Sequence, residues 1–181
     1  MNDVRKNRET PAVVVRQRDD SDLSACVEAL ADVHTRDGYP VNWPADPAGW
    51  LTTATLIDAW VAELDGRVVG HVGLSGGTKD DVAPRLLSGR EGVPLVASTG
   101  VVSRLFVAPG ARGHRIGAQL MARVVAEARA RELRPVLDVV ATDTSAIALY
   151  ERLGWELLGI ADEQWGPDQT VTMRSYHCAV R

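Results

Sequence analysis

The sequence predicts a single α/β domain, and three observations support this class. One strand-like segment precedes two helical patterns, two apolar segments meet at Asp65-Gly66, and a strand followed by a loop and a helix occurs twice in the second half. The chain has 181 residues, of which 45% are hydrophobic and 24% charged, so it can bury a full core. We expect residues 1–12 to form a flexible tail and residues 13–181 to form the domain.

The first half of the chain begins with a predicted strand over 13–16. A helix follows over about 21–34, because apolar residues recur there at helical spacing, and a shorter helix is expected from Pro47. Strands over 59–64 and 68–74 form a hairpin, since Asp-Gly between apolar segments is a strong turn signal. Residues 75–94 are rich in glycine and charge and are expected to form a flexible excursion over the active side.

The second half contains a long strand over 96–107 and a helix that starts between 113 and 116. A strand over 136–140 and a short helix after Thr142 follow it. Two last strands, over 155–161 and 170–176, are joined by a turn at 166–168. The order therefore favours one sheet with helices packed against it.

The segment 105–118 predicts an anion-binding site. It is strand-like at 105–107, Pro109-Gly110 ends the strand, and helical periodicity begins at Ile116. The first N–H groups of a helix have no partners within it, and the helix dipole is positive at that end. The main chain alone can therefore hold a phosphate or pyrophosphate there.

Four residues of this segment strengthen the prediction. Gly113 and Gly117 allow a close approach of the ligand to the backbone, while Arg112 and Arg115 supply positive charge. Neither a P-loop nor the glycine pattern of dinucleotide-binding folds occurs in the chain. The anion is therefore expected to belong to a different class of phosphate ligand.

Two motifs resemble those of the GCN5-related N-acetyltransferases (GNAT). In the first, Arg112, Arg115 and Gly117 follow the family's acetyl-CoA motif, with Arg115 in place of its usual glycine. In the second, a strand is followed by a short helix that ends in Leu-Tyr-Glu-x-Leu-Gly-aromatic, here residues 149–155. The two motifs occur in the family's order and at its spacing.

This resemblance implies a GNAT-like mixed, mostly antiparallel sheet of about seven strands flanked by helices. Its two central parallel strands, here 101–107 and 136–140, would splay to hold acetyl-CoA as cosubstrate. The pantetheine arm would pair with exposed main chain, as an added strand does. The implied cofactor-binding residues are Leu105, Phe106, Val107, Arg112, Gly113, His114, Arg115, Ile116, Gly117, Ala118 and Asp143.

Asp143 departs from many relatives, which have asparagine at that position. An ionised carboxylate accepts hydrogen bonds but does not donate them, so a plain helix cap is an equally good interpretation.

The resemblance implies an N-acetyltransferase that works by direct attack in a ternary complex. An amine would attack the thioester, an N–H near Leu105 would stabilise the oxyanion, and Tyr150 would protonate the departing thiolate. The alternative for Tyr150 is a core aromatic on an amphipathic helix. For the whole chain, the alternative is a non-catalytic acyl-CoA-binding module that acts through a protein partner.

The general base is left open by the sequence. The candidates are Glu63, His71, Asp138 or water. His71 titrates in a useful range, but it lies in an apolar strand and is equally interpreted as a structural, hydrogen-bonded histidine.

The acceptor is expected to be an amine of a small molecule or peptide. The resemblance implies that the first helices and loops grip it, here with Tyr39, Asn42, Trp43 and Trp50 and with Asp80, Asp81 and Glu91 of the excursion. An acidic rim of this kind would suit a cationic amine. The two tryptophans would form an apolar or cation-binding wall, or else cover the core.

Composition excludes several other classes. The net charge of −4 disfavours nucleic-acid binding, and no apolar run approaches the roughly 20 residues of a membrane span. Only Cys26 and Cys178 are present, without metal-site spacing, so we expect no metal and a reducing cytoplasm. No signal peptide is recognisable at the start of the chain. A homodimer is compatible with the sequence.

Overall fold

The computed structural model describes residues 12–90 and 98–179. The tail predicted over 1–12 lies outside these residues, apart from Ala12. Within the described residues, seven strands form one sheet in the order β1-β2-β3-β4-β5-β7-β6. The strands are β1 (Val13–Gln17), β2 (Leu56–Leu64), β3 (Arg67–Gly76), β4 (Thr99–Val107), β5 (Arg134–Val140), β6 (Trp155–Gly166) and β7 (Gln169–Cys178).

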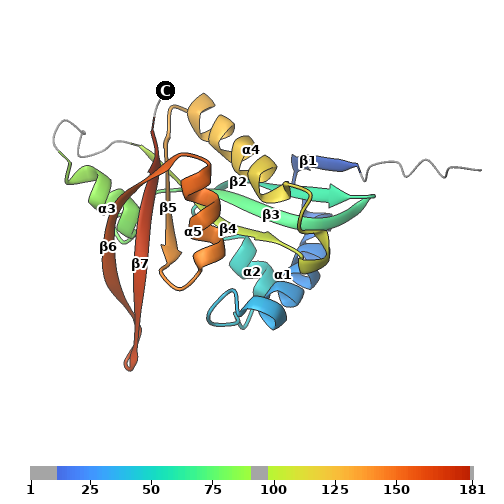
Figure 1. The fold of residues 1–181 in the computed structure, drawn as a ribbon, viewed down its shortest axis with the longest axis horizontal. Coiled ribbons are helices and arrows are strands. Elements are labelled where there is room, and N and C mark those ends of the chain that lie inside the picture. The colour runs from blue at the N-terminus through green and yellow to red at the C-terminus, as the bar shows by residue number, and fades with distance from the viewer. Residues whose placement is uncertain (1–11, 91–97, 180–181) are drawn as a thin grey trace, which may run out of the picture.

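All neighbouring strands are antiparallel except β4 and β5, which are parallel. The described residues form five α-helices that flank the sheet: α1 (Leu23–Asp37), α2 (Pro47–Leu51), α3 (Val82–Ser88), α4 (Ile116–Ala130) and α5 (Thr144–Arg152). Figure 1 shows α4 on one side of the sheet, α1 and α2 on the other, and α3 beside β6. This arrangement confirms the predicted fold class.

The hairpin of β2 and β3 turns where the sequence predicts it. Asp65 and Gly66 both have positive φ, 51° and 76°. A two-residue hairpin turn of the primed type needs this conformation at both positions.

The region predicted as a flexible excursion over 75–94 is corrected by the structure, because it contains helix α3. Val82, Ala83 and Leu87 are buried, and the helix packs against β5, β6 and β7. Pro84 occupies the first turn of the helix, where its missing N–H breaks no helical hydrogen bond. Residues 91–97, which include the start of the strand predicted over 96–107, lie outside the described residues.

The hairpin of β6 and β7 is longer than predicted, since β6 continues to Gly166 instead of 161. Its second half contains Asp162, Glu163 and Gln164, which are paired with β7 residues despite their polarity. This part of the hairpin projects beyond the rest of the sheet in Figure 1.

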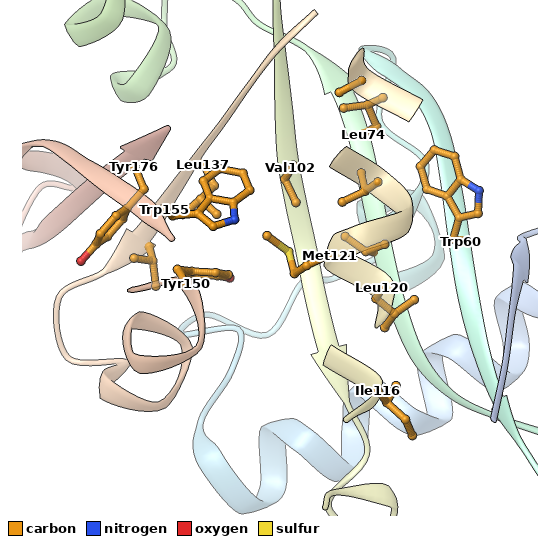
Figure 2. Packing of buried hydrophobic residues seen from close by; sticks show 14 of the residues in the cluster. Trp60, Leu74, Val102, Ile116, Leu120, Met121, Leu137, Tyr150, Trp155 and Tyr176 are labelled. Carbon is orange, nitrogen blue, oxygen red and sulfur yellow. The ribbon is translucent and has the colours of Figure 1, made fainter. Parts of the chain in front are cut away.

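The largest core cluster lies between the sheet and helices α4 and α5. Figure 2 shows Ile116, Leu120 and Met121 of α4 against the strands, with Trp60 at one end. A second cluster joins α1 and α2 to the opposite face, where Phe106 of β4 is buried. Strand β4 is therefore fixed from both faces. Among the described residues, no helix has the length and apolar character to cross a membrane.

Candidate active site

The central feature of the site is a gap between the parallel strands β4 and β5. The two strands pair only at Thr99↔Arg134, Gly100↔Pro135 and Val101↔Val136. Beyond these pairs β4 continues to Val107 with no sheet partner on this side among the described residues. This open strand edge is where the resemblance places the extended arm of the cofactor.

A β-bulge bends β4 beside this gap. Between the pairs His71↔Phe106 and Gly73↔Ser103, one residue of β3 lies opposite two residues of β4. Arg104, one of these two, has a φ of 53°, in the left-handed region. Such a bulge locally re-aims the strand, here at residues 104 and 105, where the resemblance expects the oxyanion donor.

His71 holds the bulge from the adjacent strand. Its ring is fully buried, with Nδ1 2.9 Å from the Arg104 carbonyl oxygen and Nε2 2.9 Å from Nη1 of Arg18. An arginine can only donate, so Nε2 accepts and Nδ1–H donates to the carbonyl. Burial lowers the pKa of His71 to about 4, and the ring is therefore neutral near pH 7.

Both ring nitrogens of His71 are thus engaged within the protein. This geometry favours the structural interpretation of His71 over its use as a general base. Arg18 completes the network. Its Nη1 also donates to the Leu51 carbonyl oxygen at 2.9 Å, which links the end of α2 to His71 on β3.

The start of α4 presents unpaired N–H groups, as an anion site requires. The chain turns sharply there, with Gly113 at a φ of 87° and Arg115 at 59°. In the part of the chain that the structure describes, the N–H groups of residues 113–118 have no hydrogen-bond acceptor. The left-handed position is occupied by Arg115, whereas glycine would adopt this conformation without a steric cost.

The two arginines of this segment differ in their surroundings. The Arg112 guanidinium pairs with Asp37 at the end of α1, and its Nε lies 3.4 Å from the Val107 carbonyl oxygen. Arg115 lines a shallow depression on α4 together with Ala118 and Gln119. The Arg112 side chain is therefore already engaged, whereas Arg115 lies beside the unpaired N–H groups.

Gly117 has a second role that the sequence analysis missed. A Cβ atom built on it would lie 3.2 Å from Cδ2 of Leu149 on α5. The missing side chain thus permits close packing of α4 against α5.

Tyr150 lies on α5 with only 7% of its surface exposed. Its ring packs against Trp155 and Tyr176, with centroids 6.2 and 6.3 Å away, and in Figure 2 its hydroxyl points from α5 toward β4. The hydroxyl bonds to none of the described residues. Burial raises the pKa of Tyr150, and the nearby Tyr39 and Asp143 raise it further, so the hydroxyl keeps its proton.

Asp143 caps the helix that carries Tyr150. Its Oδ1 accepts a hydrogen bond from the Ala146 N–H at 3.0 Å. The helix-cap interpretation of Asp143 is therefore confirmed, while its contact with a cofactor stays a prediction.

The two acidic candidates for the general base lie at different distances from the gap in the sheet. Glu63 is on β2, two strands from β4, where Oε1 accepts from Nη2 of Arg16 at 2.6 Å. Asp138 is on β5, which borders the gap, and accepts from Ser175 Oγ at 2.5 Å and from the Ala83 N–H at 3.2 Å. Burial raises the pKa of Asp138, although the hydrogen bond from Ser175 opposes this shift.

The expected acceptor side is formed by the segment from α1 to α2 and by the bulge. Tyr39 and Trp50 pack edge to face at 6.2 Å, and the Arg104 guanidinium lies 4.7 Å from the centre of the Trp50 ring. Asn42 and Gln169 exchange amide hydrogen bonds and so join this segment to the hairpin of β6 and β7. Trp43, by contrast, is 40% exposed, and its ring packs at a tilt against His34, with centroids 5.1 Å apart.

The roles of Arg18 and Arg104 could not be found from the sequence pattern. The available signal was a charged residue, Arg104, directly before the apolar run Leu105–Val107 of the predicted strand. No group of three or more His, Cys, Asp or Glu side chains among the described residues could hold a metal ion.

Comparison with solved structures identifies similar folds across almost the whole chain. One is the structure of yncA from Salmonella typhimurium with its cofactor acetyl-CoA. The match has 18% sequence identity and a TM-score of 0.66, and it covers 92% of this chain and 93% of the yncA chain. An N-acetyltransferase from Staphylococcus aureus is 20% identical in sequence. This match covers 92% of this chain and 98% of the other, with a TM-score of 0.69.

A ribosomal-protein-alanine N-acetyltransferase from Brucella melitensis is 22% identical, with coverages of 92% and 99% and a TM-score of 0.66. No curated protein matches the chain significantly. The model of the Acetyltransferase (GNAT) family matches residues 24–155, which span β4, the start of α4 and the helix of Tyr150. The chain therefore belongs to the GNAT acetyltransferase family.

Proposed function

We propose that the protein is an N-acetyltransferase that moves an acetyl group from acetyl-CoA to a primary amine of a small molecule or peptide. The observation that carries this proposal is the unpaired N–H array at 113–118 beside the gap between β4 and β5. Family membership and the acetyl-CoA bound to yncA of Salmonella typhimurium support it. The proposed setting is the cytoplasm.

In this proposal the cofactor is held mainly by main chain. The pyrophosphate lies at the start of α4, where the helix dipole and free N–H groups favour an anion, and Arg115 adds charge. The pantetheine arm runs along Leu105, Phe106 and Val107 in the gap. Arg112 contributes by pairing with Asp37, which fixes the loop before α4.

The chemistry is a direct transfer. The amine nitrogen attacks the thioester carbonyl, the C–N bond forms, and collapse of the oxyanion breaks the C–S bond. An N–H near Leu105 stabilises the oxyanion, and Tyr150 gives its proton to the departing thiolate. The attacking amine gives up a proton to Asp138, directly or through water, because Asp138 alone of the three candidate side chains lies on a strand that borders the gap.

The test combines a thiol-release assay over a panel of primary amines with a thermal shift by acetyl-CoA. We expect stabilisation by acetyl-CoA and release of coenzyme A that depends on one class of amine. Stabilisation without turnover on any amine would favour the non-catalytic acyl-CoA-binding module. Absence of stabilisation would contradict both functions.

A further inference from the structure

Arg104 is a partly buried cation that pairs with no carboxylate among the described residues. Its Nε is buried and has no hydrogen-bond partner, and its side chain makes one hydrogen bond to the described residues, from Nη1 to the Ser103 hydroxyl at 3.2 Å. No described carboxylate lies within ion-pair distance of the guanidinium. Partial burial of an unpaired charge has a desolvation cost, so a fold that keeps such a charge on its central strand is expected to use it.

The groups around Arg104 do not neutralise it. Tyr39 is close enough to influence its pKa, but burial raises the pKa of Tyr39, whose hydroxyl is therefore neutral. Arg18 adds a second positive charge behind the neutral ring of His71. Apart from the neutral Tyr39, the charged group that influences the pKa of Arg104 is therefore another arginine.

Other arginines of the chain provide a contrast. Arg16, Arg85 and Arg112 each pair with a carboxylate. Arg123 is the best comparison, because it also lies over a tryptophan, 5.0 Å from the Trp60 ring centre, yet it is paired with Glu127. Arg104 has the tryptophan without the carboxylate.

The backbone places this cation beside the gap. Arg104 is in the bulge whose next residue, Leu105, is the expected oxyanion donor, and its side chain lies with Trp50 and Tyr39 on the α1 and α2 side of β4. The sequence predicts that Trp43 and Trp50 form a wall that could bind a cation of the acceptor. In the structure, the cation over Trp50 is Arg104 of the protein itself, so the complementary ligand is an anion.

We propose that Arg104 binds a carboxylate of the acceptor, so that the substrate is a primary amine that also carries a carboxylate. This inference rests on the proposed transfer to an amine. Nη1–H and Nη2–H at the end of the guanidinium can donate to the two carboxylate oxygens, while Trp50 lies against the guanidinium. Arg104 would then be a specificity-determining residue that orients the amine toward the thioester.

The test compares free L-amino acids with the matching amino acid amides in the thiol-release assay. We expect the free acids to be favoured at least tenfold in kcat/KM, because a hydrogen bond between charged groups is worth roughly 1.5–3 kcal/mol. Arg104→Met should raise KM for the acids about 10- to 100-fold and leave the amides nearly unchanged. Arg123→Met, the matched control, should preserve the preference.

A second readout does not depend on turnover. The Nε–H signal of Arg104 is identified in a nitrogen-15 NMR spectrum by its loss in Arg104→Met, and free L-amino acids or amides are then titrated. A shift with acids but not with amides supports the inference, even if no amine is acetylated and the proposed function fails. Equal response to both series, or an equal loss of activity on both in Arg104→Met, would overturn the inference while leaving the acetyltransferase intact.

Discussion

The two sides of the gap between β4 and β5 present different parts of the chain to a ligand. On the expected cofactor side, the start of α4 presents main-chain N–H groups with no partner among the described residues. On the expected acceptor side, side chains from distant segments meet, with Arg18, His71 and Arg104 in one network. The first arrangement depends on a few consecutive residues, whereas the second needs the whole sheet to be folded.

This difference predicts distinct responses to substitution. A change on the cofactor side acts on local backbone geometry and on binding. A change on the acceptor side acts on the position of the bulge, on specificity and on the pH dependence of stability. The variants below test this distinction, beginning with the largest expected effect.

Tyr150 faces the gap and gives the largest expected change. Tyr150→Phe keeps the ring between Trp155 and Tyr176 but removes the proton donor. Turnover should therefore fall about 100-fold or more, while acetyl-CoA affinity and thermal stability hold. The measurement is kcat with saturating acetyl-CoA under conditions where chemistry limits the rate. A variant that folds normally and turns over at the parent rate would exclude Tyr150 as the acid.

His71 should make stability depend on pH. Its pKa is about 4 in the folded protein against an ordinary value of about 6.5, so the unfolded chain takes up a proton that the folded protein does not. Stability is therefore lost as the pH falls from about 6.5 to 4, by an amount on the order of 3 kcal/mol.

The comparison protein for this measurement is His71→Gln, which can still donate to the Arg104 carbonyl but does not titrate. The unfolding free energy of both proteins is measured by urea titration from pH 7 to pH 4. The loss of unfolding free energy should be smaller in His71→Gln, because glutamine takes up no proton when the chain unfolds. The carboxylates titrate alike in both proteins and do not contribute to this difference. Parallel curves would mean that His71 does not stay neutral in the fold.

Gly117 tests the anion site. Gly117→Asp places a carboxylate beside the free N–H groups, so acetyl-CoA at 100 times its parent Kd should no longer give the expected stabilisation of about 2.7 kcal/mol. Gly117→Ala is the matched control, because it meets the same Leu149 methyl group without adding charge. Calorimetric titration of both variants separates charge from packing. An unchanged Kd in Gly117→Asp would locate the anion elsewhere.

Arg115 gives the smallest expected effect. Its left-handed conformation, with a φ of 59°, costs a residue with a Cβ atom about 1 kcal/mol, which glycine avoids. Arg115→Gly should therefore be more stable than Arg115→Ala by about 1 kcal/mol in chemical denaturation. Both variants lack the charge, so the difference between their unfolding free energies reports the cost of the left-handed backbone conformation alone. Equal stability would indicate that the turn relaxes in one of them.

The same contrast explains how much could be predicted from the sequence. The strands, the hairpin at Asp65-Gly66 and the start of α4 follow from periodicity and turn residues, which act over a few positions. Helix α3 was missed because Pro84 and the neighbouring glycines are typical of loops, although proline is tolerated in a first turn. The polar second half of β6 was missed because its alternation lacks an apolar face.

Side-chain partners were harder to predict. His71 was left with two interpretations, because its burial and its bonds to Arg18 and Arg104 depend on contacts between segments more than 30 residues apart. Arg112 was assigned to the anion, yet its guanidinium pairs with Asp37 across a separation of 75 residues. No local pattern specifies such partners.

The central claim is that main-chain N–H groups at residues 113–118 hold the anionic part of acetyl-CoA. The most direct measurement is a titration of nitrogen-15-labelled protein with acetyl-CoA, followed through the backbone amide signals. The account predicts that the amides of residues 113–118 shift most, together with those of residues 105–107 in the gap. Saturable binding that leaves the amides of residues 113–118 unmoved would contradict it.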